Sequence, residues 1–268
     1  MGHRIPHPSA LIPLILLACV EPEPALHVTH RVVSLAPNVT EMIYAVGCGP
    51  AIVGTDNFSD YPGPVRRLPK VGGVEPDAEK IVALHPDLVI ASAAGAHPNL
   101  RRALAAAHVP LMVIETNRLA DIPVAMKKIA SALHCPATSN MTSALEQQRR
   151  KRTKSPKIIF AVWTDPLYVA GSKSFVDDLF ALTGAQNAVM AEGWPQYSLE
   201  NFAAHPPDLL LYPNRSVTRE AVDALLRRAN VRIDAVPVDE NVFTRPGPRL
   251  PLAAAELNQI LDRWEHGH

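Results

Sequence analysis

The stretch Glu79–Leu88 (EKIVALHPDL) returns in the second half of the chain as Glu200–Leu209 (ENFAAHPPDL). Glu, Pro, Asp and Leu recur at the same internal spacing, and an apolar run follows each copy. In both copies the pattern predicts a short helix that ends at the proline and a buried strand that begins at the leucine. Internal similarity of this kind predicts two lobes of related design. The alternative is a chance match between two common helix-to-strand junctions.

Strands and helices alternate outward from both copies. Asn38–Glu41 (NVTE) has the form of a capping box and predicts the start of a helix. Alternation with short, fully apolar strands predicts an α/β fold, with two Rossmann-like lobes built on central parallel sheets. Strands are predicted at Arg31–Leu35, Ile52–Gly54, Leu88–Ala91, Leu111–Ile114, Lys157–Val162, Leu209–Leu211 and Ala235–Val238. Further helices are predicted from Asp77, at about 98–107, and from Ser174, Thr218 and Leu252.

Two helices are predicted between the lobes, at Leu119–Leu133 and Pro136–Arg152. The second covers about 25 Å at 1.5 Å per residue, which is enough for a single long helix to join the lobes rigidly. The cationic run Arg149–Arg152 lies in its last turn and reads as a solvated helix end rather than as a nucleic-acid patch. The predicted segments are a signal peptide (1–18), a tether (19–30), an N-terminal lobe (31–117), linker helices (118–155) and a C-terminal lobe (156–268).

The first residues read as a targeting segment. Arg4 precedes the apolar run Leu11–Ala18, which is too short to span a bilayer and is typical of a secretory signal peptide. The run ends in Leu16-Leu17-Ala18-Cys19, which resembles the lipobox of bacterial lipoproteins, where the cysteine is lipidated after cleavage. An ordinary signal peptide that contains a cysteine is the alternative. We predict an exported protein of the periplasm or cell envelope, anchored in the membrane through lipid on Cys19.

Composition excludes several classes of protein. Lys+Arg and Asp+Glu balance at 26 each and hydrophobic residues make up 47%, which excludes a disordered chain and argues against nucleic-acid binding. We find no phosphate-binding loop, dinucleotide fingerprint, zinc-protease motif or serine-hydrolase elbow, and the histidines are dispersed. We therefore predict no catalytic residue, no metal and no cofactor. Cys48 and Cys135 remain in the mature chain, and the sequence does not show whether they meet to form a disulfide.

Aromatic residues are scarce, at 5% of the chain, yet half of them fall in predicted loops or at strand ends. A chain with so few aromatic residues would ordinarily place them in its core. Their position beside Gly and Pro predicts a cleft that stacks on a large flat or apolar ligand, although core packing is the alternative for each of them. The residues in question are Phe58, Tyr61, Trp163, Tyr168, Trp194, Tyr197 and Phe243.

Five short stretches carry a family resemblance: Ser34–Glu41 (SLAPNVTE), Ser59–Pro62 (SDYP), Glu79–Leu88, Trp194–Glu200 (WPQYSLE) and Phe243–Arg249 (FTRPGPR). Together they make the sequence, over about residues 31–264, resemble the periplasmic substrate-binding proteins of ABC importers whose two lobes are joined by one rigid helix. Within that family the sequence is most similar to the cobalamin receptors, which are related to receptors for haem and ferric siderophores. The first and third stretches resemble the whole superfamily, whereas Ser-Asp-Tyr-Pro together with Trp-Pro-Gln is more particular to the cobalamin branch.

The resemblance implies a ligand held between the lobes. One wall of the cleft would carry Pro37, Phe58 and Tyr61, and the other Trp163, Trp194, Phe243 and Arg245. Glu79 and Glu200 match an acidic pair, one residue in each lobe, that binds arginines on the membrane subunits of the importer. The chain departs from the family near Val74 and Ser92, where some cobalamin receptors carry Trp and this sequence has small residues.

These observations lead us to expect a monomeric receptor that captures cobalamin or a related corrinoid and delivers it to the membrane subunits of an ABC importer. A haem or ferric-siderophore receptor of the same family is the alternative. Siderophore complexes are usually anionic, whereas the cations of the predicted cleft loops are chiefly Arg245 and Arg249. A metal-dependent enzyme on a related two-lobed fold is a further alternative, which turnover of the ligand would reveal.

Overall fold

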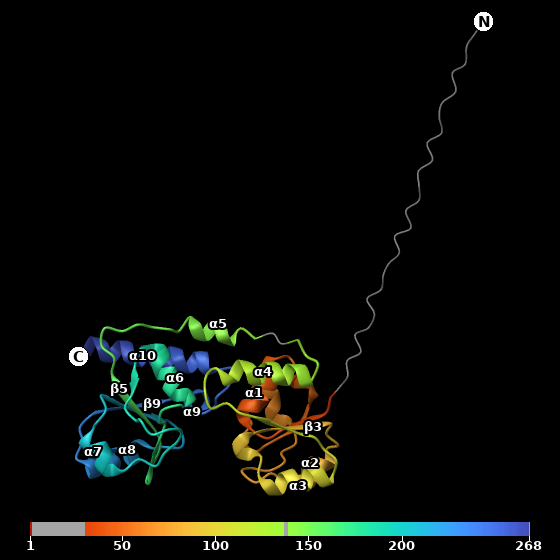
Figure 1. The fold of residues 1–268 in the computed structure, drawn as a ribbon, viewed down its shortest axis with the longest axis horizontal. Helices are drawn as coiled ribbons and strands as arrows, with labels where there is room; N and C mark the ends of the chain where they lie inside the picture. Colours follow the sequence, from red (N-terminus) through yellow and green to blue (C-terminus); the bar gives the residue numbers. More distant parts are fainter. Residues whose placement is uncertain (2–29, 137–138, 268) are drawn as a thin grey trace.

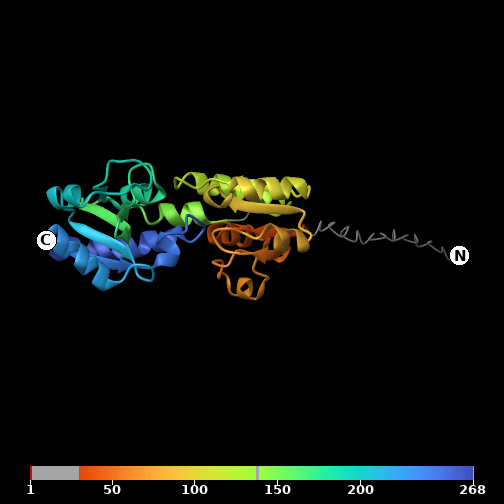
Figure 2. The same cartoon turned by 90° about the horizontal axis from the view of Figure 1, so that it is seen from below.

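The computed structural model describes Met1 and residues 30–136 and 139–267. The predicted signal peptide, Cys19 and nearly all of the tether lie outside the described residues. The chain forms two α/β lobes that lie side by side in both views (Figure 1, Figure 2). Among the described residues, no helix has both the length and the apolar composition needed to cross a membrane.

In the N-terminal lobe, strands and helices alternate in the order β1 (Val32–Ser34), α1 (Pro37–Ala45), β2 (Ile52–Thr55), α2 (Ala78–Ala83), β3 (Leu88–Ser92), α3 (Pro98–Ala106), β4 (Leu111–Ile114) and α4 (Asp121–Ala132). The strands are parallel, in the order β2-β1-β3-β4. Successive side chains of a strand point to opposite faces, so the apolar runs bury both sides of the sheet. Val32 and Ile90 pack with α1 and α4, whereas Val33 and Val89 pack with α2 and α3.

The C-terminal lobe contains β5 (Lys157–Thr164), β6 (Leu167–Val169), α6 (Phe175–Thr183), β7 (Gln186–Asn187), α7 (Leu199–Ala204), β8 (Leu209–Pro213), α8 (Arg219–Ala229), β9 (Asp234–Val238), α9 (Glu240–Phe243) and α10 (Leu250–Gly267). The sheet order is β6-β5-β8-β9, with β7 also paired to β5. Only β6 pairs antiparallel among these described strands. Ile158 and Phe160 pack with α6 and α10, whereas Ile159 and Ala161 face α7 and α8. The predicted pattern of two lobes with parallel sheets is confirmed.

The repeated Pro-Asp-Leu segment has the same structural role in both lobes. In the first lobe the Asp87 carboxylate accepts the backbone N–H of Arg31 at 2.8 Å, and the Asp87 N–H donates to the Arg31 carbonyl at 2.8 Å. In the second lobe Asp208 makes the same two contacts with Lys157, at 2.7 and 2.8 Å. Each aspartate therefore joins the entry of one strand to the start of the neighbouring strand, so the two copies are equivalent in structure as well as in sequence.

The connection between the lobes differs from the predicted long helix. The first linker helix is confirmed as α4, but the second, α5, covers only Met141–Glu146 and continues as an irregular segment into β5 (Figure 1). Consecutive cations of the Arg149–Arg152 run repel one another in a helix, and Arg152 instead reaches the last helix of the chain. Its side chain is 4% exposed, and its guanidinium pairs with Asp262 at 2.7 Å and with Glu265 at 3.3 Å. Arg152 is therefore an anchor onto α10, whereas Arg149, Arg150 and Lys151 are exposed beyond the end of α5.

Cys48 and Cys135 form a disulfide, which settles the pairing that the sequence left open. Their Cα atoms lie 6.0 Å apart, and the two residues are separated by 87 positions in the chain. Cys48 follows α1 and Cys135 follows α4, so the bridge joins the ends of two helices on the same face of the N-terminal sheet. A covalent link that closes so long a loop restricts the unfolded chain and stabilises this lobe.

Candidate functional site

The candidate site lies where loops at the carboxyl ends of strands from the two lobes meet. In open α/β sheets, ligands bind beyond the carboxyl ends of the strands. In the N-terminal lobe β1 leads into α1, and β2 leads into the loop 56–62. In the C-terminal lobe β9 leads into α9 and the loop 244–249. These segments touch across the lobe boundary, since the Asn38 side-chain amide donates to the carbonyl of Pro246 at 3.3 Å.

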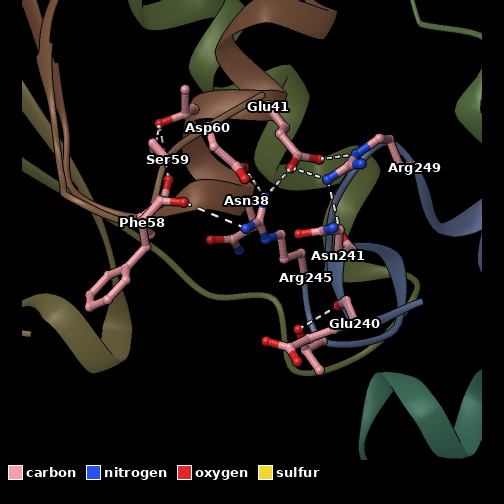
Figure 3. A network of polar contacts seen from close by, with 12 residues as sticks. Asn38, Glu41, Phe58, Ser59, Asp60, Glu240, Asn241, Arg245 and Arg249 are labelled. Carbon is pink, nitrogen blue, oxygen red and sulfur yellow. Dashed lines mark hydrogen bonds and ion pairs between the residues drawn. The ribbon is translucent and has the colours of Figure 1, made fainter. Parts of the chain in front are cut away.

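A buried carboxylate of the first lobe binds two guanidiniums of the second lobe. The Glu41 side chain is 1% exposed, and the Arg249 Nε donates to its Oε2 at 2.8 Å. Arg245 Nη1 donates to Glu41 Oε1 at 3.3 Å and to Asp60 Oδ1 at 2.7 Å (Figure 3). A buried carboxylate is tolerated only when charged or polar partners replace its lost water. Glu41 therefore requires its arginine partners in the second lobe, and so it requires the contact between the lobes.

The capping box predicted at Asn38–Glu41 is wrong. Helix α1 begins at Pro37, and Ala36 occupies the N-cap position without a side-chain hydrogen bond. Both polar side chains are drawn away from the helix end because their partners lie in the other lobe: Asn38 contacts Pro246 and Glu41 contacts the two arginines. The same two residue types that would cap a helix locally thus serve a long-range contact.

Tyr61 completes this contact on the solvent side. The guanidinium carbon of Arg249 lies 4.3 Å from the centre of the Tyr61 ring, within the range of a cation–π interaction. Arg249 is therefore held between the Glu41 carboxylate and the Tyr61 ring. Burial on its own would raise the pKa of Asp60, but the hydrogen bond from Arg245 and the charges of Arg245 and Arg66 together lower that pKa. Asp60 accordingly stays ionised well into the acid range.

A buried polar network fixes the loop that carries Phe58 and Tyr61. Ser59 Oγ donates to the Asp56 carboxylate and lies 2.8 Å from Thr40 Oγ1, and all three residues are at most 2% exposed. Asp56 also accepts the backbone N–H of Phe58 at 3.0 Å. Burial raises the pKa of Asp56, and its hydrogen bonds and the charge of Lys70 oppose that effect. Asp56 thus fixes the backbone of the loop on its buried side, and the Phe58 and Tyr61 side chains are exposed on the other.

Most of the aromatic residues that the sequence assigned to loops are exposed. The exposed fractions are 53% for Phe58, 47% for Tyr61, 51% for Trp163, 38% for Tyr168 and 42% for Trp194. Trp163 and Tyr168 pair across β5 and β6, and the Trp194 ring lies 5.7 Å from that of Phe175. Both lobes thus carry large aromatic side chains that are open to solvent.

Two of the predicted aromatic residues lie elsewhere. Phe243 is fully buried, with its ring 5.9 Å from Phe160, so its assignment to a ligand wall is wrong. The short helix α9 turns its apolar side under the sheet, which the loop-like sequence around Phe243 did not indicate. Tyr197 is half-buried against the core of the C-terminal lobe. Pro37 is half-buried at the first position of α1, and Arg245 has both its carboxylate partners in the first lobe.

Glu41 and Asp60 were not predicted as members of the site, and Arg249 was noted only as a cation of the predicted cleft loops. All three nevertheless lie within stretches that the family resemblance singled out, namely SLAPNVTE, SDYP and FTRPGPR. Val74 is strongly exposed and Ser92 is half-buried, so neither small residue is hidden inside the lobe. The available signal was therefore the co-occurrence of two carboxylates and two arginines in separate short motifs.

Glu79 and Glu200 occupy equivalent helix positions. Each is the second residue of its helix, α2 or α7, and follows an N-cap side chain, Asp77 or Ser198, that accepts backbone N–H groups. Both glutamates are exposed. Within the described part of the chain, neither carboxylate has a hydrogen-bond or ion-pair partner. They are charges held at the surface and available to a partner.

A second contact joins the lobes on the side of the linker. Arg118 Nε, just before α4, donates to Asp178 Oδ2 on α6 at 2.8 Å. A cavity of about 760 Å³ lies beside this pair, between α4, α5 and α6. None of the exposed aromatic residues lines it. The lobes are thus braced at two places, by Glu41 near the aromatic loops and by Arg118 near the linker.

Comparison with known proteins gives consistent likenesses. A model of the periplasmic binding protein family matches residues 32–239. The vitamin B12-binding protein of Pectobacterium atrosepticum is 27% identical over 257 residues, covering 90% of this chain and 91% of that protein. The periplasmic heme-binding protein RhuT of Roseiflexus sp. RS-1, solved in its apo form, has a TM-score of 0.74 and 27% identity over 88% of this chain and 99% of its own. The periplasmic vitamin B12 binding protein BtuF of Vibrio cholerae, at 23% identity and a TM-score of 0.68, shares the fold over 88% and 98% of the two chains.

Replacing Glu41 by Gln should destabilise the protein strongly. The change leaves Arg249 and Arg245 partly buried without their shared charge, and breaking one partner of a buried ion pair costs about 3–5 kcal/mol. Denaturant unfolding measures the loss. The control is Asp223→Asn, which removes a carboxylate from an exposed pair with Arg219 and should cost at most about 1 kcal/mol. Equal unfolding midpoints for the two variants would contradict a stabilising role of the Glu41 contact.

Proposed function

We propose, on the premise that the chain belongs to the periplasmic binding protein family, that it is an extracytoplasmic receptor which captures cobalamin or a related corrinoid between its two lobes and delivers it to an ABC importer. The observation that carries the proposal is that both lobes expose large aromatic side chains, Phe58 and Tyr61 on the first and Trp163, Tyr168 and Trp194 on the second. Membership of the family places the chain among exported, ligand-binding transport components.

The exposed aromatic residues suit a large, flat ligand. Phe58 and Tyr61 stand on the first lobe, and Trp163 and Trp194 on the second. Leaving such side chains in water forgoes the free energy of burying them, about 25 cal/mol per Å² of apolar surface. A corrin ring inserted between the lobes would cover these faces and recover that free energy. The relative of Pectobacterium atrosepticum is named a vitamin B12-binding protein, and the match extends along nearly its whole length. This likeness supports the choice of a corrinoid.

Haem is the second candidate ligand. The likeness in fold to RhuT, a heme-binding protein, supports it. Haem iron needs an axial ligand from the protein, and Tyr is among the residues that supply one. Tyr61 and Tyr168 are exposed and carry phenol groups on opposite lobes. Arg249 covers one face of the Tyr61 ring, which leaves Tyr168 the less encumbered of the two.

Glu79 and Glu200 are proposed to dock the receptor on the membrane subunits. Their equivalent positions at the start of α2 and α7 present one carboxylate from each lobe. A receptor with two related lobes that docks on a two-fold symmetric importer needs the same charge twice. The lipid anchor at Cys19 lies outside the described residues and remains a proposal based on the lipobox alone.

The ligand proposal is tested by titrating the purified protein with cyanocobalamin, haemin and a ferric siderophore. We expect one cyanocobalamin to bind per chain and to be released unchanged. Trp194→Ala should weaken binding by about thirtyfold, because an aromatic anchor in a desolvated site is worth about 2 kcal/mol. Val124→Ala, which trims an exposed apolar residue on α4, serves as the control and should bind as wild type does. Tight binding of haemin with no binding of cyanocobalamin would replace the corrinoid by haem.

The docking proposal predicts that Glu79→Ala combined with Glu200→Ala abolishes uptake while ligand affinity stays unchanged. Losing one partner of a desolvated interfacial pair costs about 2–5 kcal/mol, so binding to the membrane subunits should fall accordingly. Uptake by cells and binding to the reconstituted importer are the measurements. Glu220→Ala is a matched control, since Glu220 is the exposed second residue of α8 and feels the same helix dipole. Normal uptake by the double variant would leave the two glutamates as favourable helix-start residues only.

A further inference from the structure

The contact between the lobes is balanced in charge. Two guanidiniums, of Arg245 and Arg249, face two carboxylates, of Glu41 and Asp60. Arg249 pairs with Glu41, and Arg245 pairs with Asp60 at 2.7 Å while sharing Glu41 at 3.3 Å. The two arginines that the sequence offered as cations for an anionic ligand are therefore already neutralised within the protein.

The same balance holds beside the aromatic residues of the second lobe. Asp165, two residues after Trp163, pairs with Arg228 at 3.0 Å. Glu192, two residues before Trp194, pairs with Lys173. On the first lobe, Asp60 lies between Phe58 and Tyr61 in the chain. A carboxylate close in sequence to Phe58, Trp163 or Trp194 thus engages a nearby cation in each case.

Asp60 is the member of the lobe contact that can act on a ligand. The Glu41 side chain is 1% exposed, whereas that of Asp60 is 38% exposed. Arg245 Nη1 lies 3.3 Å from the Glu41 carboxylate and only 2.7 Å from that of Asp60, so Asp60 is its nearer partner. Without the Asp60 charge, two arginines would share one carboxylate, and the site would carry one unit of positive charge next to Phe58 and Tyr61.

We propose that Asp60 sets the charge selectivity of the receptor: by engaging Arg245 it keeps the site neutral, so that an uncharged, amide-bearing corrinoid binds and the same ring carrying a carboxylate is rejected. A carboxylate entering the site finds Arg245 and Arg249 already paired and meets the negative charge of Asp60, so the loss of its water is poorly compensated. The proposal rests on the proposed function, because it names the chemical class of ligand taken by the same site.

The test compares two probes that differ only in charge. They are cyanocobalamin and its monocarboxylic acid, in which one side-chain amide is hydrolysed. Wild type should bind the amide form at least tenfold more tightly than the acid, and Asp60→Asn should bring the two affinities to within about threefold of each other. Asp223→Asn is the matched control, because Asp223 is also 38% exposed and also pairs with an arginine, on α8. It should keep the wild-type ratio.

A second variant separates charge from structural damage. Arg245→Gln leaves the site with an excess negative charge and should widen the preference for the amide form, the opposite direction to Asp60→Asn. General loosening of the lobe contact would change the ratio of amide to acid affinity in the same direction in both variants, and that result would overturn the proposal. Equal binding of amide and acid by wild type, or an unchanged ratio in Asp60→Asn, would overturn it as well. A wild type that binds neither probe would instead overturn the proposed function, and this inference with it.

Discussion

The buried carboxylate of Glu41 is the constraint on which the arrangement of the two lobes depends. It sits on the first helix of one lobe and has its charged partners, Arg249 and Arg245, in the other lobe. A buried carboxylate without charged partners would destabilise the fold strongly. The contact between the lobes therefore stabilises their arrangement. The linker helix α5 is short, and the Arg118–Asp178 pair supplies a second brace between the lobes.

The fixed contact also explains the positions of the aromatic residues. One loop carries Phe58, Asp60 and Tyr61. Its backbone is fixed by the buried Asp56 and Ser59, and Arg245 contacts it from the second lobe. The polar residues of this loop thus hold its backbone and the contact between the lobes, while Phe58 and Tyr61 stay exposed. A receptor preset in this way spends little binding free energy on ordering its site.

Much of the fold could be predicted from local patterns. Apolar runs located the parallel strands, and the repeat Glu79–Leu88 located the equivalent junctions of the two lobes, since both signals lie within ten residues. The candidate site was harder because its contacts join residues about 200 positions apart, such as Glu41 and Arg249. Glu41 resembled a helix cap and Phe243 a loop aromatic, and each was misassigned because its true partner is distant in sequence. The prediction of a helix over Pro136–Arg152 was wrong for the same reason, because Arg152 is held by Asp262 on the last helix.

The central claim is that the lobes are held at a nearly constant separation and that a ligand enters between surfaces already in place. Solution scattering of the protein, free and saturated with cyanocobalamin, tests this most directly. Hinge motion of two lobes on a flexible connection would change the overall dimensions, whereas braced lobes would not. We expect radii of gyration that agree within experimental error. A marked contraction on binding would contradict the account, because it would mean that the Glu41 contact does not set the distance between the lobes.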